Sequence, residues 1–226
     1  MTSIKLSKRL SLIASMIDEG SLLADIGCDH ALLDIYLLNK GIIKKAIACD
    51  IAEGSVKQAY KNALKNNIKN IDIRLSDGLS MISYKDKIDT MVMSGLGDQK
   101  IIKIIDRDID KIKYVNSIII QSNVGVSNIR KYFTGIGYFI ADEKLIKERN
   151  IIYTIIKFKK GYKKYNSKQI KFGPILLKNK DNIFNELLSN FIEKNNNIIK
   201  QIPKYMIIKK LKLKLINILL KKEMNS

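Results

Sequence analysis

The fold of this 226-residue chain is decided by the stretch Leu22-Leu23-Ala24-Asp25-Ile26-Gly27-Cys28-Asp29-His30. Its apolar beginning is long enough for a buried strand and too short for most helices, and a new apolar-periodic segment follows the glycine. We therefore expect a strand, a tight turn and a helix. In a parallel sheet such a turn opens at the carboxyl end of its strand, where ligands bind, and Gly27 lets a ligand approach the backbone closely. The stretch predicts a cofactor site.

The turn after this strand is unsuited to phosphate. It lacks the third glycine of the G-x-G-x-x-G pattern, and Asp29 adds negative charge near a helix start that favours anions. A strand-end acid followed by Gly-x-Asp suits a cationic, phosphate-free nucleoside instead. S-adenosylmethionine fits this description, because its ammonium and sulfonium groups both favour carboxylates. The alternative is an ordinary strand-to-helix turn in which Asp25 or Asp29 caps the helix.

A second buried strand, over residues 45–51, also ends on an acid. Asp50 follows Asp25 by 25 residues. This is close to the offset at which a carboxylate after the second strand of a βαβ unit accepts hydrogen bonds from ribose hydroxyls. In the alternative interpretation, Asp50 caps the helix that begins near Glu53.

Strands and helices then alternate along the chain. An amphipathic helix over residues 7–18 precedes the first strand, and a short helix follows Gly78. Further strand patterns cover residues 71–75, 88–93, 114–121, 138–141 and 151–158. The last two strands flank a charged loop, 142–150, and predict a hairpin at one sheet edge. The alternation predicts an α/β fold with a Rossmann-like, doubly wound, mostly parallel sheet.

Four strand ends carry distinctive residues, namely Asp25-Ile26-Gly27, Asp50, Asp77-Gly78 and Gly95-Leu96-Gly97. A single Asp-Gly pair is a turn by default. In a doubly wound sheet, however, all four ends converge on one crevice. Together they predict a nucleoside-type cofactor site.

Positive charge is concentrated at the C-terminal end of the chain. The net charge is +19, and residues 157–226 contain 18 Lys, no Arg and 4 acidic residues. A codon bias toward lysine would spread the charge more evenly, so we favour a basic surface for nucleic acid over a merely solvated lysine face. The absence of arginine favours diffuse phosphate contacts over base reading.

The C-terminal composition also predicts a separate helical region. Apolar positions after Gly173-Pro174 approximate two heptad-like sets, at 184, 188, 191, 198 and 202 and at 208, 211, 215 and 218. We expect two antiparallel helices in a hairpin (coiled coil); the alternatives are a dimerising coiled coil and a plain solvated hairpin. The expected domains are residues 1–160 and residues 161–226.

Several classes of protein are disfavoured. No apolar run approaches the roughly 20 residues that cross a bilayer, and the N-terminus lacks a secretory signal pattern. Cys28 and Cys49 are the only cysteines and belong to no metal-binding pattern. We expect a cytoplasmic protein with free thiols, no metal ion and no membrane partner, and a monomer.

The sequence resembles the bacterial tRNA (adenine(22)-N1)-methyltransferase family, one of the class I S-adenosylmethionine-dependent methyltransferases. The resemblance covers nearly the whole chain and is carried by residues 6–10 (LSKRL), 24–31 (ADIGCDHA), 76–79 (SDGL), 95–97 (GLG), 121–123 (QSN) and 172–174 (FGP). It implies S-adenosylmethionine as methyl donor and tRNA as substrate. Two departures are Asp98, where the family more usually has glycine, and Asp50, where it often has glutamate.

The resemblance also implies roles for individual residues. The methionine end of the cofactor would be lined by Asp25, Gly27, Cys28 and Asp29, with His30 at its edge. The ribose would contact Asp50 and Ile51, and the adenine would contact Asp77 and Gly78. The methyl-transfer side would be formed by Ser94, Gly95, Leu96 and Gly97. Lys8 and Arg9 would contact the substrate. His30 is better interpreted as a hydrogen-bonding residue of the first helical turn than as a general base, and Cys28 is a poor candidate for a nucleophile.

The chemistry of adenine explains why the site has few candidate catalytic groups. N1 of neutral adenine already has a lone pair, so methyl transfer from a sulfonium asks mainly for alignment and exclusion of water. Backbone carbonyls of residues 94–97 and the side chains of Gln121 and Asn123 are candidates to face the exocyclic amine, because amides bind an adenine edge. N1 lies on the pairing edge, so the base must be exposed or flipped out.

Two other functions remain open on the sequence. One is a class I methyltransferase acting on another RNA or on a small molecule, and the lysine-rich end disfavours the small molecule. The other is a nucleic-acid-binding module whose Rossmann core has lost its chemistry. Such a core would have no reason to retain the complete set of strand-end acids.

Overall fold

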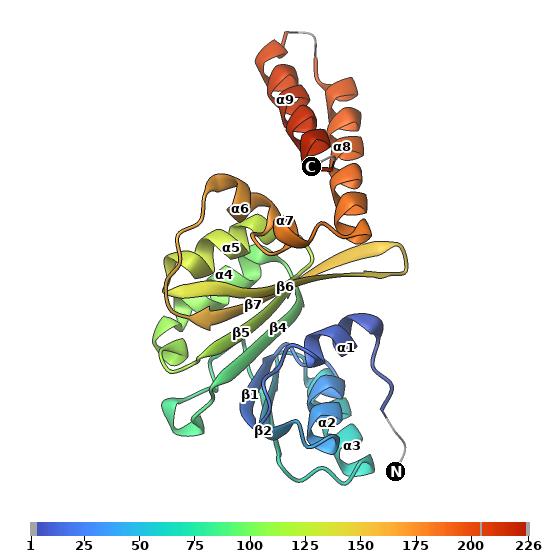
Figure 1. Cartoon of the computed structure of the whole chain (residues 1–226). Helices are drawn as coiled ribbons and strands as arrows, with labels where there is room; N and C mark the ends of the chain where they lie inside the picture. Colours follow the sequence, from blue (N-terminus) through green and yellow to red (C-terminus); the bar gives the residue numbers. More distant parts are fainter. Residues whose placement is uncertain (1–3, 204, 225–226) are drawn as a thin grey trace. The chain divides into compact units, whose positions relative to one another are not determined.

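A seven-stranded sheet organises residues 21–160 of the computed structural model, which describes residues 4–203 and 205–224 (Figure 1). Its strands are β1 (Ser21–Ile26), β2 (Ile43–Asp50), β3 (Ile71–Leu75), β4 (Thr90–Leu96), β5 (Ser117–Ser122), β6 (Tyr138–Glu148) and β7 (Ile151–Lys160). Their order is β3-β2-β1-β4-β5-β7-β6. Strands β1 to β5 are parallel, whereas β7 is antiparallel to β5 and β6 to β7. The predicted doubly wound α/β fold and its edge hairpin are confirmed.

Helices cover both faces of the sheet. On one face lie α1 (Lys8–Ala14), α2 (Leu32–Asn39) and α3 (Glu53–Lys65), and on the other lie α4 (Asp98–Arg107) and α5 (Val126–Gly135), with α6 (Ser167–Phe172) packed against α5 (Figure 1). Two short 3₁₀ turns are η1 (Tyr84–Asp86) and η2 (Ile109–Ile112). Because both faces are covered, the central strands are buried on both sides, and every residue of β5 is buried.

One apolar core cluster lies between the sheet and the α1–α2 layer. Ile13 of α1, Leu23 of β1 and Leu37 of α2 are fully buried there. The core continues across β5 and β7 through Ile119 and Ile155. It therefore holds the first strand and the start of the second helix in place around the turn between them.

Three local expectations were wrong. Helix α1 ends at Ala14 instead of Asp18, because the chain tightens into i→i+3 hydrogen bonds, yet Met16 and Ile17 still face the core and prolong the apolar pattern. The charged segment expected as a loop over 142–150 is mostly strand, since β6 pairs with β7 as far as Glu148. Most charged side chains of this edge strand remain partly exposed to water, and the buried Glu143 is paired with Arg130. The short helix expected after Gly78 is a turn followed by η1.

The chain divides into two compact units, Met1–Pro174 and Ile175–Ser226. The division lies after the boundary expected at residue 160 because the intervening segment is bound to the first unit. The Arg130 guanidinium of α5 donates to the carbonyls of Ile170 and Lys171, and the Tyr165 hydroxyl accepts from the Ile140 N–H. Residues 161–174 therefore finish the sheet domain.

The second unit is the predicted helical hairpin. It contains α7 (Leu176–Asn179), α8 (Asn182–Gln201) and α9 (Ile207–Met224), and α8 packs along α9. Three amides join the two helices: Asn195 donates to Asn217 and Asn217 donates to Asn196, each at 2.8 Å. A polar layer of this kind fixes the register of paired helices.

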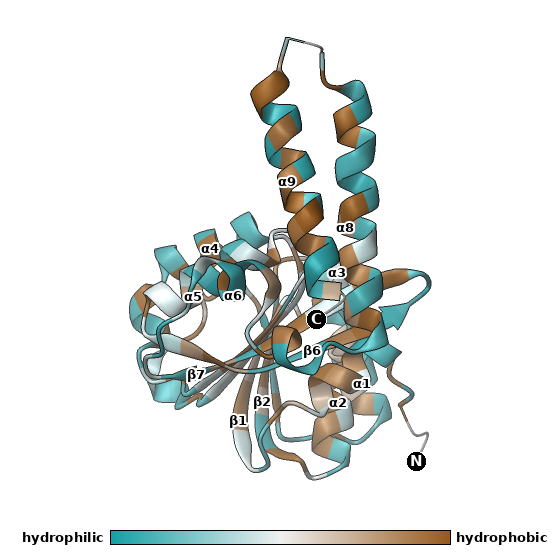
Figure 2. Cartoon of the chain, turned by 45° about the horizontal axis from the view of Figure 1, so that its top comes forward, coloured by the Kyte–Doolittle hydropathy of each residue, from teal (hydrophilic) through white to brown (hydrophobic). Residues whose placement is uncertain are grey.

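The predicted contact face of α9 was wrong. Ile208, Leu211, Leu215 and Ile218 are 58–71% exposed, whereas Asn217 and Leu220 are buried. Apolar residues occur on several sides of α9 (Figure 2), so periodicity alone does not identify the packed side. Among the described residues, no helix is long and apolar enough to cross a bilayer. The same part of the chain contains no cluster of three or more His, Cys, Asp or Glu suited to a metal ion.

The buried ion pair between Arg130 and Glu143 yields a stability prediction. Their side chains are 3% and 0% exposed, and Arg130 Nε lies 2.6 Å from Glu143 Oε1. Glu143→Gln leaves a buried guanidinium uncompensated and should lower the free energy of unfolding by about 3–5 kcal/mol, measured by urea denaturation. The matched control is Glu53→Gln, which breaks the exposed pair with Lys57 and should cost under about 0.5 kcal/mol. Equal losses of unfolding free energy in the two variants would contradict a stabilising role for the Arg130–Glu143 pair.

Candidate functional site

A cavity of about 340 Å³ opens at the carboxyl edge of the sheet, a volume typical of small-ligand sites. It lies where the strand order reverses between β1 and β4, the position at which doubly wound sheets bind ligands. Most of the predicted site residues line it: Arg9, Asp25, Gly27, Cys28, Asp29, His30, Asp50, Ile51, Asp77, Gly78, Ser94, Gly95 and Leu96. Lys8, Gly97, Gln121 and Asn123 lie outside the lining.

The turn after β1 is held in an unusual backbone conformation. Gly27, Asp29 and Ala31 all have positive φ, at +81°, +54° and +53°. For the two non-glycine residues this conformation costs of order 1 kcal/mol each, and such strain concentrates at ligand sites. The Cys49 carbonyl accepts hydrogen bonds from the N–H groups of Gly27 and Cys28, so the end of β2 fixes the turn.

Asp50 connects the ends of β1 and β2. Its Oδ2 accepts from the Asp29 N–H at 3.0 Å, and its Oδ1 accepts from the Ala52 N–H at 2.9 Å. The second bond holds the chain just before α3, whose N-cap residue is Ala52, and no side chain caps this helix, so the capping role considered for Asp50 is not found. Each carboxylate oxygen has a further lone pair. Asp50 can therefore hold the turn and still accept a hydroxyl from a ligand.

The third strand end is braced from α4. Arg107 donates to Asp77 Oδ2 at 2.7 Å and also to the Asp77 carbonyl oxygen. Gly78 has φ +59°, and a Cβ there would lie 2.7 Å from Ile104, which also lines the cavity. A glycine is needed for both reasons. The sequence pattern identified Asp77 and Gly78 but not Arg107, which lies 30 residues later in an ordinary helical context.

The fourth strand end is a distorted strand instead of the predicted turn. β4 continues to Leu96, and its pairing with β5 is irregular at Gly95, where φ is +79°. Gln121 is fully buried beneath it. Gln121 Oε1 accepts from the Gly95 N–H at 3.1 Å and from the Arg9 guanidinium. The Gln121 side-chain oxygen therefore holds the end of β4 in this conformation.

Asn123 adds further hydrogen bonds to the end of β4. Its Oδ1 accepts from Gln121 Nε2 at 3.0 Å, and its Nδ2 donates to the Gly95 carbonyl at 2.7 Å. The Leu96 carbonyl is also engaged, by the Asn123 N–H at 3.0 Å. Gln121 and Asn123, expected to face an adenine edge, therefore make hydrogen bonds within the protein. Their geometry suits residues that position the strand end.

Asp98 ties the same strand end to α5. Its Oδ2 accepts from Asn128 Nδ2 at 2.7 Å, and this hydrogen bond lowers the pKa of Asp98. A Cβ on Gly125 would lie 2.0 Å from Asp98 Oδ2, so the carboxylate occupies the space that the glycine leaves free. The acid that departs from the family pattern is therefore a structural contact between α4 and α5.

Arg9 brings a cation to the Ser94 end of the cavity. It reaches from α1 to donate to Ser94 Oγ at 3.1 Å, and its guanidinium carbon lies 5.4 Å from the centre of the Tyr153 ring. The neighbouring Lys8 is exposed and uses its backbone N–H to bind Glu148. Of the two predicted substrate contacts, only Arg9 lines the cavity.

Sequence reasoning missed Asp34, a fully buried acid on α2. Burial and then the neighbouring Asp34 and Asp50 carboxyls raise the pKa of Asp25 well above its ordinary value. Burial also raises the pKa of Asp34 to about 6. The available signal was an acid inside the apolar run Leu32–Leu38, which a helix buried against a sheet does not tolerate without a reason.

The thiols of Cys28 and Cys49 are unreactive near neutral pH. Burial, with the nearby acids, raises the pKa of Cys28, and burial raises the pKa of Cys49 to about 12. Both remain neutral near pH 7, which argues against a thiolate nucleophile. His30 Nδ1 lies 3.5 Å from Asp29 Oδ1 at the rim. The site is thus rich in carboxyl groups and suits a cationic ligand that also bears hydroxyls.

Comparison with known proteins supports this chemistry. The family described as tRNA (adenine(22)-N(1))-methyltransferase matches residues 23–223 of the chain. The Bacillus subtilis (strain 168) tRNA (adenine(22)-N(1))-methyltransferase is 30% identical over 209 residues, which cover 89% of this chain and 87% of the relative.

Two solved structures extend the comparison to bound ligands. A Streptococcus pneumoniae protein in complex with S-adenosyl-L-methionine is 28% identical with a TM-score of 0.90, covering 97% of this chain and 100% of that one. The M. capricolum protein TrmK in complex with S-adenosyl-homocysteine is 32% identical with a TM-score of 0.86, covering 97% and 98%.

Proposed function

Because the chain belongs to the tRNA (adenine(22)-N(1))-methyltransferase family, we propose that it transfers the methyl group of S-adenosylmethionine to N1 of adenine 22 of tRNA. The observation that carries this proposal is the family match over residues 23–223, which contains all four predicted strand ends and the lysine-rich hairpin. The acid-lined cavity at the switch point supports it independently, since its chemistry favours a cationic nucleoside.

The cofactor is proposed to lie along the carboxyl edge of the sheet. Asp25 and the turn from Gly27 to His30 would hold the methionine end, because an ammonium group needs a carboxylate partner. Asp50 would accept the ribose hydroxyls with Ile51 beside the ring, and Asp77-Gly78 would receive the adenine. The free lone pairs of Asp50 and the glycine at 78 support this order.

Methyl transfer is proposed to occur beside Gly95 and Leu96. When bound, the sulfonium supplies a methyl group for in-line displacement by adenine N1. The protein's contribution is alignment, which is worth many kcal/mol when the reacting atoms are held close. Gln121 and Asn123 hold the strand end, and Arg9 fixes Ser94 from α1. N1 attacks with an existing lone pair, so no residue is required to deprotonate it.

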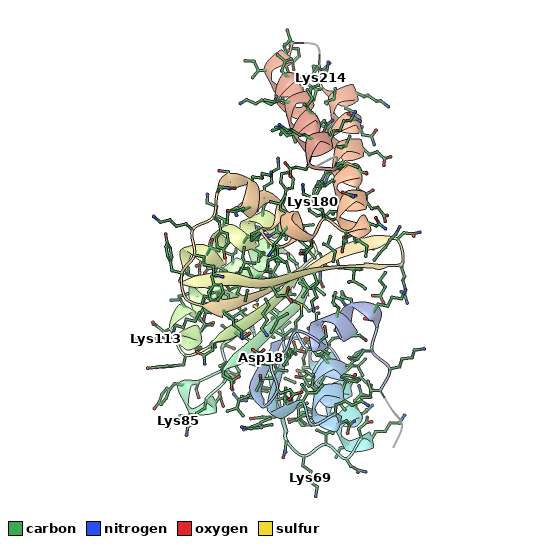
Figure 3. All side chains as sticks on the ribbon, viewed as in Figure 1. Asp18, Lys69, Lys85, Lys113, Lys180 and Lys214 are labelled. Atoms are coloured by element: carbon green, nitrogen blue, oxygen red, sulfur yellow. The ribbon has the colours of Figure 1, made fainter. Side chains whose placement is uncertain are left out.

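The hairpin is proposed to bind the tRNA backbone. α9 carries six lysines and one acid, and Lys214 points outward from it (Figure 3). Lysines without arginine suit phosphate contacts that position RNA without reading its sequence. We further propose that the enzyme acts in the cytoplasm, as a monomer and without a metal ion.

The direct test is methylation of an unmodified tRNA transcript, followed by nucleoside analysis. We expect 1-methyladenosine to form with S-adenosylmethionine, and to disappear when adenine 22 is replaced by guanine. Methylation at another position, or of the guanine variant, would indicate a different RNA substrate. Cofactor binding without methylation of any tRNA would overturn the proposed reaction.

Two substitutions should separate cofactor binding from turnover. Asp50→Asn should weaken cofactor binding by about tenfold or more, since a hydrogen bond to a charged group contributes about 1.5–3 kcal/mol. Asn123→Ala should lower kcat while leaving cofactor affinity within about twofold, because it loosens the Gly95 carbonyl. Calorimetry and steady-state kinetics measure the two effects. Full activity in Asn123→Ala, or unchanged affinity in Asp50→Asn, would remove that residue from the site.

The hairpin's role predicts a change in salt dependence. Lys209, Lys212, Lys214 and Lys221 are exposed on α9, and replacing all four with Gln should weaken tRNA binding and flatten the log–log salt slope by up to roughly 3. The matched control replaces Lys44, Lys69, Lys85 and Lys113, which are exposed and precede or begin strands at the amino edge of the sheet. Lys69, Lys85 and Lys113 are labelled in Figure 3. Equal effects of the two sets would show that only net charge matters.

A further inference from the structure

Asp34 is a buried acid to which the proposed reaction assigns no role. It is fully buried in the first turn of α2, and neither of its carboxylate oxygens has a hydrogen-bond donor in the described structure. Its acidic neighbour is the Asp25 carboxyl, which lines the cavity and interacts with it electrostatically. Asp25 lies on β1 and Asp34 on α2, so a buried acid without a hydrogen-bond partner among the described residues stands behind the ligand site.

Two ionised carboxylates in contact both accept hydrogen bonds and neither can donate one. They form a hydrogen bond only if one of them holds a proton, and two neighbouring buried negative charges repel strongly. Burial therefore favours a shared proton, and the raised pKa values of Asp25 and Asp34 agree with this geometry.

The surroundings of the pair increase this tendency. Asp50 at the end of β2 adds a third carboxyl group, and the facing thiols of Cys28 and Cys49 are neutral. Arg9 of α1 and Lys100 of α4 line the same cavity, but within residues 4–203 and 205–224 no basic side chain forms an ion pair with Asp25 or Asp34. An ammonium group of a ligand can supply the cation that these residues lack.

We propose that Asp34 belongs to the cofactor site: in the free enzyme Asp25 and Asp34 share one proton, and they release it when the ammonium group of the cofactor binds at Asp25. The inference rests on the cofactor placement proposed above. In this step one carboxyl O–H bond breaks, the proton passes to the buffer, and an ammonium N–H···O hydrogen bond to Asp25 replaces it. No bond of the cofactor changes.

The proposal fixes the sign of a pH effect. The free enzyme binds one more proton than the complex, so cofactor affinity rises with pH, by up to about tenfold per unit while the free pair retains its proton. Affinity levels off once the pair has ionised. Asp34→Asn removes the shared proton but keeps the contact, since an amide N–H donates to the Asp25 carboxylate. Its cofactor affinity should therefore vary little with pH.

The test counts protons released on binding, by calorimetry at pH 7 in buffers of different ionisation enthalpy. S-adenosyl-homocysteine and 5′-methylthioadenosine form a matched pair of probes, because both contain the thioether nucleoside and only the first has an ammonium group. We expect release of roughly one proton with the first probe and none with the second. Asp34→Asn should bind S-adenosyl-homocysteine with no release. Asp110→Asn, which alters an exposed acid on η2, should behave like the unmodified protein.

Each outcome decides a specific point. Binding of S-adenosyl-homocysteine without proton release, or release that persists in Asp34→Asn, would overturn the role of the pair while leaving the methyltransferase function intact. If Asp34→Asn does not fold, the two probes on the unmodified protein still decide the proposal. Failure of the unmodified protein to bind either S-adenosylmethionine or S-adenosyl-homocysteine would overturn the proposed function as well.

Discussion

The reversal of strand order between β1 and β4 is the constraint on which the rest of the site depends. Crossovers after these strands leave in opposite directions, so no helix covers the gap at their carboxyl ends. The sheet therefore delivers Asp25 and Gly95 from neighbouring strands to one cavity, and β2 adds Asp50 beside them. Once that geometry exists, the choice of acids at the strand ends determines which ligand is favoured.

Hydrogen bonds between strand ends then make the site rigid before any ligand arrives. Asp50 holds the Asp29 backbone, and Gln121 holds Gly95 from beneath. A reaction that relies on alignment benefits from such preorganisation, because the protein does not have to order these loops during binding. Gln121 is fully buried, and buried polar groups have to be satisfied, so its hydrogen bonds stabilise the fold as well as the site.

The strand ends were predictable because their information is local. An apolar run, an acid and a glycine lie within a few residues of one another, and parallel topology brings separate examples together. The partners Arg107 and Asp34 were not predictable, because they acquire their roles from contacts between distant segments. Gln121 was predicted as a site residue, but its contact with Gly95 depends on how β4 and β5 pair. The extent of β6 depended on pairing with β7, and the packed face of α9 could not be chosen from a helix with apolar residues on several sides.

A crystal structure of the protein with bound S-adenosyl-homocysteine would show whether the strand-end acids form one cofactor site. We expect the ammonium group against Asp25, the ribose hydroxyls within hydrogen-bonding distance of Asp50, and the adenine beside Asp77 and Gly78. A ligand that occupies the cavity with its ribose away from Asp50 and its ammonium away from Asp25 would contradict this placement.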